Sequence, residues 1–180
     1  MTPLRITGGS LKGRRVPIPK GARPTSERAR QAYFNIVGDR IHDARFLDLF
    51  AGSGIFSFEA VSRGASSATA VDISRASVAA IEKLAKEFAC AVKSVQADFV
   101  AGIKRSGGSV FDLVYADPPY DWEQYDELLM SIDEHAQLAD GALVAIEHRR
   151  RTTPFTSTPK RLEFQRRAEY GEVWIDFFIA

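Results

Sequence analysis

Residues 111–120 combine an apolar segment with an acidic turn, and their side-chain types suggest chemistry on a planar base. The apolar segment suits a strand buried on both faces, and Pro118 and Pro119 end it because proline lacks an N–H and fixes φ. Asp117 and Tyr120 flank the two prolines. A carboxylate and rigid backbone carbonyls beside a flat ring suit a base held by its amino group. A capping aspartate in an ordinary turn is the alternative.

A glycine-rich loop, Asp48-Leu49-Phe50-Ala51-Gly52-Ser53-Gly54, follows another buried segment and enters a helix. Its glycines let the backbone turn sharply and approach a ligand closely. Asp72 ends the next strand, where it suits ribose hydroxyls, and Asp98 ends the third, where it suits an adenine amino group. Because open α/β sheets bind ligands at the carboxyl ends of their strands, this repetition predicts a nucleoside cofactor.

Simpler interpretations of these residues stay open. Asp72 can help to cap a helix at Ser74, Asp98 can cap a helix that begins at Phe99, and the loop glycines can serve only a tight turn. A dinucleotide fingerprint would have glycine or alanine where Ser57 stands, so a pyrophosphate ligand is disfavoured. A ligand without phosphates, such as S-adenosylmethionine, suits the acidic loop better.

The pattern that positions these residues alternates strands with helices, which predicts an α/β fold with a mostly parallel sheet covered on both faces. A helix capped at Ser74 follows the second strand, and a later helix carries Leu128, Leu129, Ile132 and Leu138. The predicted strands are 46–50, 68–73, 92–98, 111–116 and 142–146, with a C-terminal antiparallel hairpin of 161–167 and 172–179.

The first 40 residues precede this pattern as a basic extension. Residues 4–6 and 14–18 predict a β-hairpin, and Thr25 or Ser26 caps a helix that ends at Gly38. We expect residues 1–40 to pack on a domain of residues 41–180 as one globular unit.

Composition sets the protein class. The chain has 180 residues, 45% hydrophobic and 26% charged, which fits one globular domain. Its single cysteine, Cys90, cannot form an internal disulfide, and neither a signal peptide nor an apolar stretch of about 20 residues is visible, so a soluble, cytoplasmic protein is expected. A monomer is expected as a separate prediction. The isolated His42, His135 and His148 lack ligand partners at metal-binding spacing, so no metal is expected.

Charge is unevenly distributed although the net charge is only +1. The first 30 residues hold one acid, Glu27, and many cations, which predicts contacts to phosphate; a solvated polar face is the alternative. A second basic cluster, His148 to Arg151, favours neither interpretation. The predicted RNA-binding residues are Arg5, Lys12, Arg14, Arg15, Arg23, Arg28 and Arg30.

Together these motifs resemble class I S-adenosylmethionine-dependent methyltransferases, with the 48–54 loop for the cofactor and Asp117-Pro118-Pro119-Tyr120 for the amino group. The chain is similar to the RsmD family over nearly its whole length, including Arg5-Ile6-Thr7-Gly8-Gly9, Gly13-Arg14-Arg15, Arg23-Pro24-Thr25, Phe34-Asn35, residues 59–65 and Tyr170-Gly171. The basic front end separates this family from DNA adenine methyltransferases with the same acidic turn.

The resemblance implies a Rossmann-like fold and methyl transfer to N2 of a guanine in bacterial small-subunit (16S) rRNA, either as naked rRNA or in an assembling 30S subunit. It also implies catalytic roles for Asp117, Pro118, Pro119 and Tyr120. The implied cofactor-binding residues are Asp48, Phe50, Ala51, Gly52, Ser53, Gly54, Asp72, Ile73, Asp98 and Phe99.

Three other functions are considered. The nearest is another amino-group methyltransferase, acting on N6 of adenine, N4 of cytosine or a protein glutamine. A NAD-dependent oxidoreductase would use the Gly52 loop but leaves Asp117-Pro118-Pro119-Tyr120 unexplained. An inactive RNA-binding module would have no use for that turn.

Overall fold

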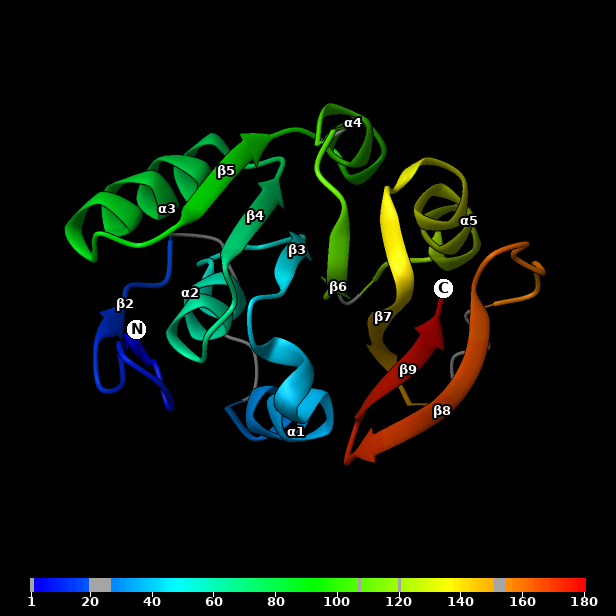
Figure 1. Cartoon of the computed structure of the whole chain (residues 1–180), viewed down its shortest axis with the longest axis horizontal. Helices are drawn as coiled ribbons and strands as arrows, with labels where there is room; N and C mark the ends of the chain where they lie inside the picture. Colours follow the sequence, from blue (N-terminus) through cyan, green and yellow to red (C-terminus); the bar gives the residue numbers. More distant parts are fainter. Residues whose placement is uncertain (1, 20–26, 107, 120, 151–154) are drawn as a thin grey trace.

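Seven strands form one sheet in the order β5-β4-β3-β6-β7-β9-β8, with helices on both faces (Figure 1). The computed structural model describes residues 2–19, 27–106, 108–119, 121–150 and 155–180. The strands of this sheet are β3 (Arg45–Leu49), β4 (Ser67–Asp72), β5 (Val92–Gln96), β6 (Phe111–Ala116), β7 (Leu138–Arg149), β8 (Glu163–Tyr170) and β9 (Val173–Ile179). The helices are α1 (Glu27–Val37), the 3-10 helix η1 (Gly38–Ile41), α2 (Ile55–Ser62), α3 (Arg75–Glu87), α4 (Phe99–Arg105) and α5 (Tyr125–His135).

The first five strands of the sheet are parallel, and β9 and β8 finish it as an antiparallel hairpin. The strand order reverses between β3 and β6: the chain runs outward from β3 to β5 and then returns to β6 on the other side. Such a switch point opens a crevice at the carboxyl ends of the neighbouring strands. This observed topology confirms the predicted fold class.

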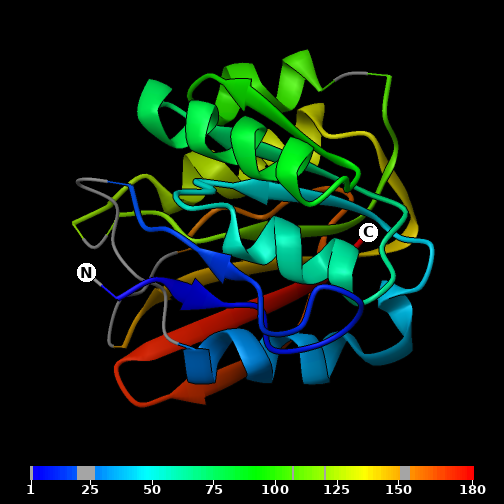
Figure 2. The same cartoon turned by 90° about the vertical axis from the view of Figure 1, so that its left-hand side faces the viewer.

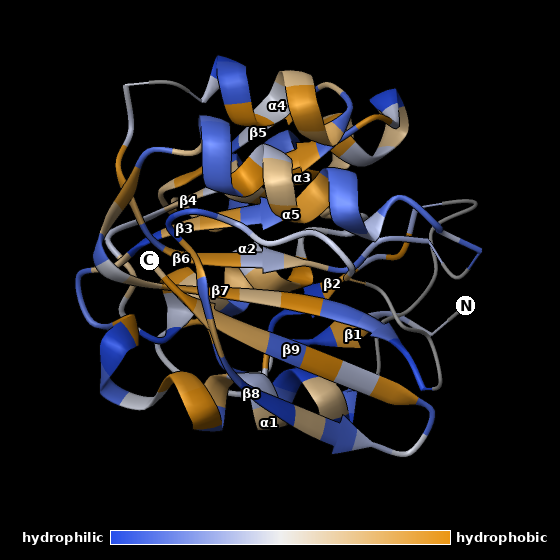
Figure 3. Cartoon of the chain, turned by 90° about the vertical axis from the view of Figure 1, so that its right-hand side faces the viewer, coloured by the Kyte–Doolittle hydropathy of each residue, from blue (hydrophilic) through white to orange (hydrophobic). Residues whose placement is uncertain are grey.

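Two hydrophobic cores lie on the two faces of the sheet because successive strand residues point to opposite sides. Phe46 of β3 faces the core that contains residues of α1, α2 and α3. Its neighbour Leu47 faces the core that contains residues of α4 and α5. Hydrophobic residues accordingly dominate the central strands between the helix layers (Figure 3).

The N-terminal strands β1 (Leu4–Arg5) and β2 (Arg15–Val16) form a separate two-stranded sheet beside α2 (Figure 2). Their loop presses against the end of α2: a Cβ on Gly9 would lie 1.6 Å from the Ser62 carbonyl oxygen, so only glycine fits. Ser10 N donates to that same carbonyl over 2.7 Å. The described part of the extension therefore packs on the main body, while the proposed boundary at residue 40 stays a prediction.

Several element boundaries differ from the sequence predictions: the fifth strand, predicted at 142–146, spans 138–149, and the third, predicted at 92–98, ends at Gln96. Leu138, predicted in the helix after β6, instead begins β7, where it pairs with Phe111. Helix α5 ends at His135 because the next residue, Ala136, is extended at φ −73° and ψ 136°. A register shift between Phe111 and Leu113 follows, so β7 contains an irregularity that a periodic pattern hides.

Among the described residues no helix is long and apolar enough to span a membrane. The same residues contain no group of three or more His, Cys, Asp or Glu side chains arranged to hold a metal ion. Thr25, Ser26, Arg23 and Tyr120, which the sequence analysis singled out, lie outside the described residues.

Candidate active site

The loop between β3 and α2 is built from left-handed backbone conformations. Phe50, Gly52 and Gly54 have φ values of 61°, 55° and 75°. A Cβ on Gly54 would lie 2.8 Å from Ile81 Cγ1, so packing excludes any other residue there. At Gly52 a Cβ would meet only the Phe50 carbonyl oxygen, at 3.9 Å, so the space above this residue is open. The loop therefore presents bare backbone to that open space.

Asp72, at the end of β4, fixes this loop. Its Oδ2 accepts from Gly52 N at 2.7 Å, and its Oδ1 accepts from Ser74 N at 2.7 Å. The capping role that the sequence left open is therefore present, since Ser74 also caps α3. Beside it, Ile73 exposes 73% of its surface, so an apolar side chain is available for contact with a flat ligand.

Asp98 caps α4 by accepting from Ala101 N at 2.8 Å, and its side chain remains exposed. The next residue, Phe99, is buried, and its ring lies 5.7 Å from Phe50 and 5.5 Å from Trp122 between centroids. Phe50 and Trp122 are 5.0 Å apart. These three rings join the cofactor loop, α4 and the acidic turn into one aromatic cluster, and no short-range sequence signal connects them.

Trp122 also carries an unsatisfied donor. Its Nε1 is buried and has no hydrogen-bond partner within the described part of the chain. A buried indole N–H ordinarily finds an acceptor, so this atom points to a polar ligand group or an acceptor outside the described residues.

Asp48, the first acid of the loop, is buried beneath it rather than exposed to a ligand. Its Oδ2 accepts from Ser57 N at 3.1 Å and from Ser57 Oγ at 2.7 Å. Burial raises the pKa of Asp48 to about 7, and the nearby Asp117 and Asp72 add to the increase. Asp48 therefore supports the loop from below, and its predicted contact with the cofactor stays a prediction.

The acidic turn continues directly from β6. Leu49 of β3 pairs with Ala116, and Asp117 N approaches the Leu49 carbonyl oxygen at 3.4 Å. The turn therefore lies against the start of the cofactor loop. Pro118 is buried and Pro119 is exposed. Trp122 N donates to the Pro119 carbonyl over 3.0 Å, which closes the turn.

A second carboxylate, which the sequence analysis missed, lies at the same edge. Glu147 of β7 is 9% exposed, and its Oε2 accepts from the Tyr115 hydroxyl at 2.5 Å. Burial raises the pKa of Tyr115 well above its usual value, and Glu147 and Asp117 raise it further. The only local signal for Glu147 is that it is the first acid after an uninterrupted apolar strand.

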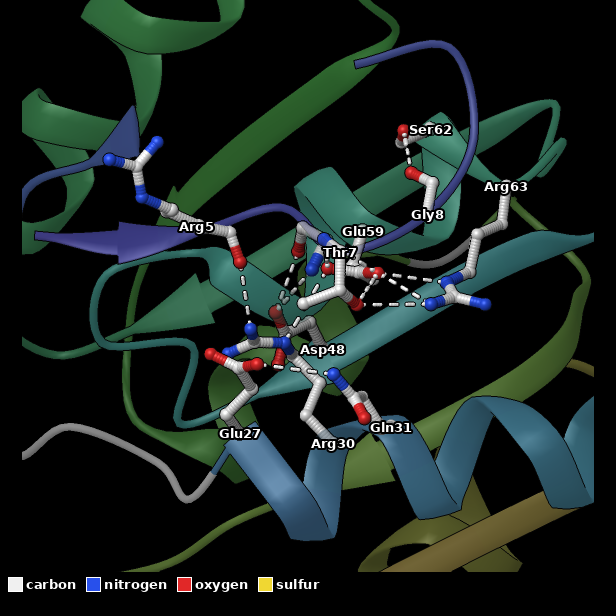
Figure 4. A network of polar contacts seen from close by, with 11 residues as sticks. Arg5, Thr7, Gly8, Glu27, Arg30, Gln31, Asp48, Glu59, Ser62 and Arg63 are labelled. Carbon is white, nitrogen blue, oxygen red and sulfur yellow. Dashed lines mark hydrogen bonds and ion pairs between the residues drawn. The ribbon is translucent and has the colours of Figure 1, made fainter. Parts of the chain in front are cut away.

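A buried polar network joins the N-terminal segment to α2 (Figure 4). Glu59 is fully buried and accepts from Thr7 N at 2.9 Å and from Thr7 Oγ1 at 2.6 Å. Arg63 forms an ion pair with it at 2.8 Å, and Arg30 Nε lies 3.5 Å from its Oε2. Arg30 Nη2 also donates to the Arg5 carbonyl over 2.8 Å.

Arg30 was predicted to contact RNA, and the structure contradicts this. Its side chain is 0% exposed and occupied by Glu59 and the Arg5 carbonyl. Burial lowers its pKa and outweighs the effect of Glu59, which raises it. Arg30 therefore anchors the extension and does not face phosphate. The remaining described members of the predicted set, Arg5, Lys12, Arg14, Arg15 and Arg28, are exposed.

The reversal of strand order, the glycine loop after β3 and the acidic turn after β6 together define a class I S-adenosylmethionine-dependent methyltransferase. The chain belongs to the RsmD family: the family profile described as Conserved hypothetical protein 95 matches residues 4–179. This membership confirms the family resemblance of the sequence motifs.

Known proteins agree with this assignment. "Ribosomal RNA small subunit methyltransferase D" of Escherichia coli is 36% identical over 80% of this chain and 74% of its own length. "Putative rRNA methyltransferase YlbH" of Bacillus subtilis is 31% identical over 93% of this chain and 94% of its own. The solved structure of "Putative methyltransferase yhhF" from E. coli superposes with a TM-score of 0.84 at 31% identity, covering 98% of this chain and 97% of that one.

Proposed function

We propose that the protein transfers a methyl group from S-adenosylmethionine to the exocyclic N2 of a guanine in bacterial small-subunit rRNA, within the cytoplasm. The observation that carries the proposal is the position of Asp117, next to the end of β3 where the cofactor loop starts. The names of the E. coli and B. subtilis relatives support RNA as the substrate. Whether the substrate is naked rRNA or an assembling 30S subunit is a further point for experiment.

The residues around the loop fit the cofactor. Gly52 leaves open space for a closely approaching ligand. Exposed Asp98 offers acceptors to an adenine amino group, and exposed Ile73 offers an apolar contact surface for the flat ring. Asp72 holds the loop and suits the ribose hydroxyls. S-adenosylmethionine, when bound, supplies an electrophilic methyl group on a sulfonium centre.

The acidic turn would activate the acceptor nitrogen. The amino nitrogen of guanine is a poor nucleophile because its lone pair is delocalised into the ring. Asp117 and the Pro118 carbonyl accept the two amino hydrogens and turn the lone pair out of the ring plane. Within the described part of the chain no backbone N–H donates to the Pro118 carbonyl, whereas the Pro119 carbonyl accepts from Trp122 N. Asp117 also offsets the positive charge that develops on nitrogen and accepts the proton that nitrogen loses.

The exposed cations of the extension would hold the RNA. Extruding a guanine from its stack costs a few kcal/mol, and phosphate contacts from Arg5, Lys12, Arg14, Arg15 and Arg28 offset it. Arg14 lies over the Phe88 ring at 5.4 Å, so the hairpin cations are placed beside the main body. Tyr120 as a stacking partner and Arg23 as a phosphate contact stay predictions, as does a monomeric state.

The test is incubation of small ribosomal subunits, and separately of protein-free rRNA, with cofactor labelled in its methyl group. Nucleoside analysis of the digested RNA should show labelled N2-methylguanosine at one position. Labelled methyladenosine or methylcytidine in place of N2-methylguanosine would contradict the proposal.

A further inference from the structure

Asp117 directly follows the last residue of β6, and Glu147 lies in the neighbouring parallel strand β7, two residues before its end. β6 and β7 are in register at Ala116 and Ile146, and each acid is the next residue along its chain. Neighbouring strands are about 4.8 Å apart, so the two residues begin side by side at the edge of the sheet. Tyr115 pairs with Ala145, which places its side chain on the same face as Glu147, two residues further along β7.

The carboxylate of Glu147 is held in place from below. Tyr115 is fully buried, and its ring stacks on Phe56 at 3.8 Å and contacts Tyr33 at 4.8 Å between centroids. Its hydroxyl donates to Glu147 Oε2 over 2.5 Å. A carboxylate offers about four acceptor positions, and this bond fixes the orientation of the group.

Asp117 and Glu147 both influence the pKa values of the same two tyrosines. Burial raises the pKa of Tyr125 to about 12, and Asp117 and Glu147 contribute in the same direction while Arg149 opposes them. The pKa of Tyr115 responds to the same two acids. Asp117 therefore does not stand alone: a second carboxylate, fixed by a buried phenol, shares the site where the base would be held.

We propose that Glu147 is a specificity-determining residue that accepts the N1–H of guanine while Asp117 accepts from the N2 amino group. This inference rests on the proposed function. On the Watson–Crick edge of guanine, N1–H and the N2 amino group are neighbouring donors, which two neighbouring carboxylates match. Adenine places an acceptor at N1, which would face the Glu147 carboxylate and be repelled. Tyr115 is the positioning residue for Glu147.

The test uses an RNA fragment spanning the methylated position, with guanine or 2-aminopurine at that position. 2-Aminopurine keeps the amino group but has an acceptor at N1 and no oxygen at C6, so the contribution of N1 is the part of the preference for guanine that changes when Glu147 is replaced. The wild-type protein should prefer guanine by about 100-fold in kcat/KM, as expected when a site built to bond a donor meets an acceptor. Fluorescence of the 2-aminopurine RNA during titration without cofactor, followed by displacement with the guanine RNA, gives the binding preference separately from turnover.

Glu147→Gln should reduce the ratio of kcat/KM for guanine over 2-aminopurine by about tenfold or more. The reason is that an amide can accept from N1–H of guanine or donate to N1 of 2-aminopurine. Glu172→Gln, which changes a 78% exposed acid in the β8–β9 turn, is the matched control and should keep the wild-type preference. Tyr115→Phe keeps Glu147 but removes its hydrogen bond, so a smaller narrowing is expected. It also tests the idea if Glu147→Gln does not fold.

The outcomes separate the two claims. If the wild-type protein methylates no guanine, the proposed function fails. If it methylates guanine N2 but Glu147→Gln slows both bases by the same factor, or the wild type does not discriminate, the proposed function stands and the role of Glu147 is overturned.

Discussion

The two halves of the carboxyl edge of the sheet are built differently. On the cofactor side, at the ends of β3, β4 and β5, each acid accepts from a backbone N–H within about 20 residues: Asp48 from Ser57, Asp72 from Gly52 and Asp98 from Ala101. On the base side, where β6 ends beside β7, Glu147 is held by the side chain of Tyr115, 32 residues away. The cofactor side is thus shaped by local backbone geometry and the base side by tertiary side-chain contacts.

This difference predicts that substitutions on the two sides separate turnover from cofactor binding. The largest effect is expected for Asp117→Ala, which removes the acceptor for the amino group. Turnover on RNA should fall by about 10³-fold or more, in line with the loss of a group that stabilises developing charge. Single-turnover transfer to small subunits measures it. Asp121→Ala, an exposed acid just beyond the turn, is the control and should retain most activity. Turnover of Asp117→Ala within tenfold of the wild type would contradict the assignment.

A second substitution tests whether the buried network around Glu59, which joins α2 to the N-terminal extension, stabilises the fold. Glu59→Gln leaves Arg30 fully buried with its charge uncompensated. Removing one partner of a buried ion pair costs about 3–5 kcal/mol, so the free energy of unfolding in urea should fall by that amount. The exposed Glu87→Gln on α3, outside this network, should change it by less than about 0.5 kcal/mol. A similarly small loss for Glu59→Gln would show that the network of Figure 4 does not stabilise the extension.

A third prediction concerns pH. The pKa of Asp48 is about 7 in the folded protein and about 3.9 in an unfolded chain, so the folded state binds more protons between those values. Stability from this group therefore falls as pH rises from about 4 to 7. Asp48→Asn cannot ionise but keeps an acceptor for Ser57, so it should lose this dependence.

Between pH 5 and 8, the stability of Asp48→Asn relative to the wild type should rise by about 2–3 kcal/mol. Thermal or urea unfolding at several pH values measures the change. The exposed Asp140→Asn should follow the wild-type profile. If Asp48→Asn also follows it, the carboxyl of Asp48 is not the buried group that titrates.

The smallest effect is expected for the RNA contacts, which lie away from the cofactor. Replacing Arg14 and Arg15 together with alanine should weaken RNA binding about tenfold at low salt and reduce the salt slope by about 2. Cofactor affinity should stay constant. Lys104→Ala with Arg105→Ala on α4 removes the same charge from another element and should leave RNA affinity near that of the wild type. Unchanged RNA affinity after the Arg14 and Arg15 substitutions would exclude the hairpin as an RNA contact.

The same contrast explains what the sequence could predict. The parallel strands and the cofactor loop follow from strand-like segments, four of which carry Asp48, Asp72, Asp98 or Asp117 near their carboxyl ends, and β6 matches its predicted bounds, Phe111–Ala116. The start of β7 at Leu138 was not predictable, because the irregularity beside Phe111 depends on strand pairing. Residue patterns along the chain therefore predict features that depend on neighbouring residues, but not features that depend on which strands pair.

Arg30 and Glu147 mark the limit of sequence reasoning. A run of basic residues predicts a charged surface, but whether one member turns inward depends on a distant acid, here Glu59. Glu147 gains its place only because β6 and β7 pair in one particular register. Neither relation is visible in spacing along the chain.

The most direct test of the division between the two sides is calorimetric titration of S-adenosylmethionine into two single variants, Asp72→Ala and Asp117→Ala. Asp72→Ala frees the Gly52 backbone and should weaken cofactor binding by about tenfold or more, since a partly buried donor loses its charged acceptor. Asp117→Ala should bind within about threefold of the wild type, because its carboxylate serves the base. Equal weakening in both variants, or loss of binding in Asp117→Ala alone, would contradict the account.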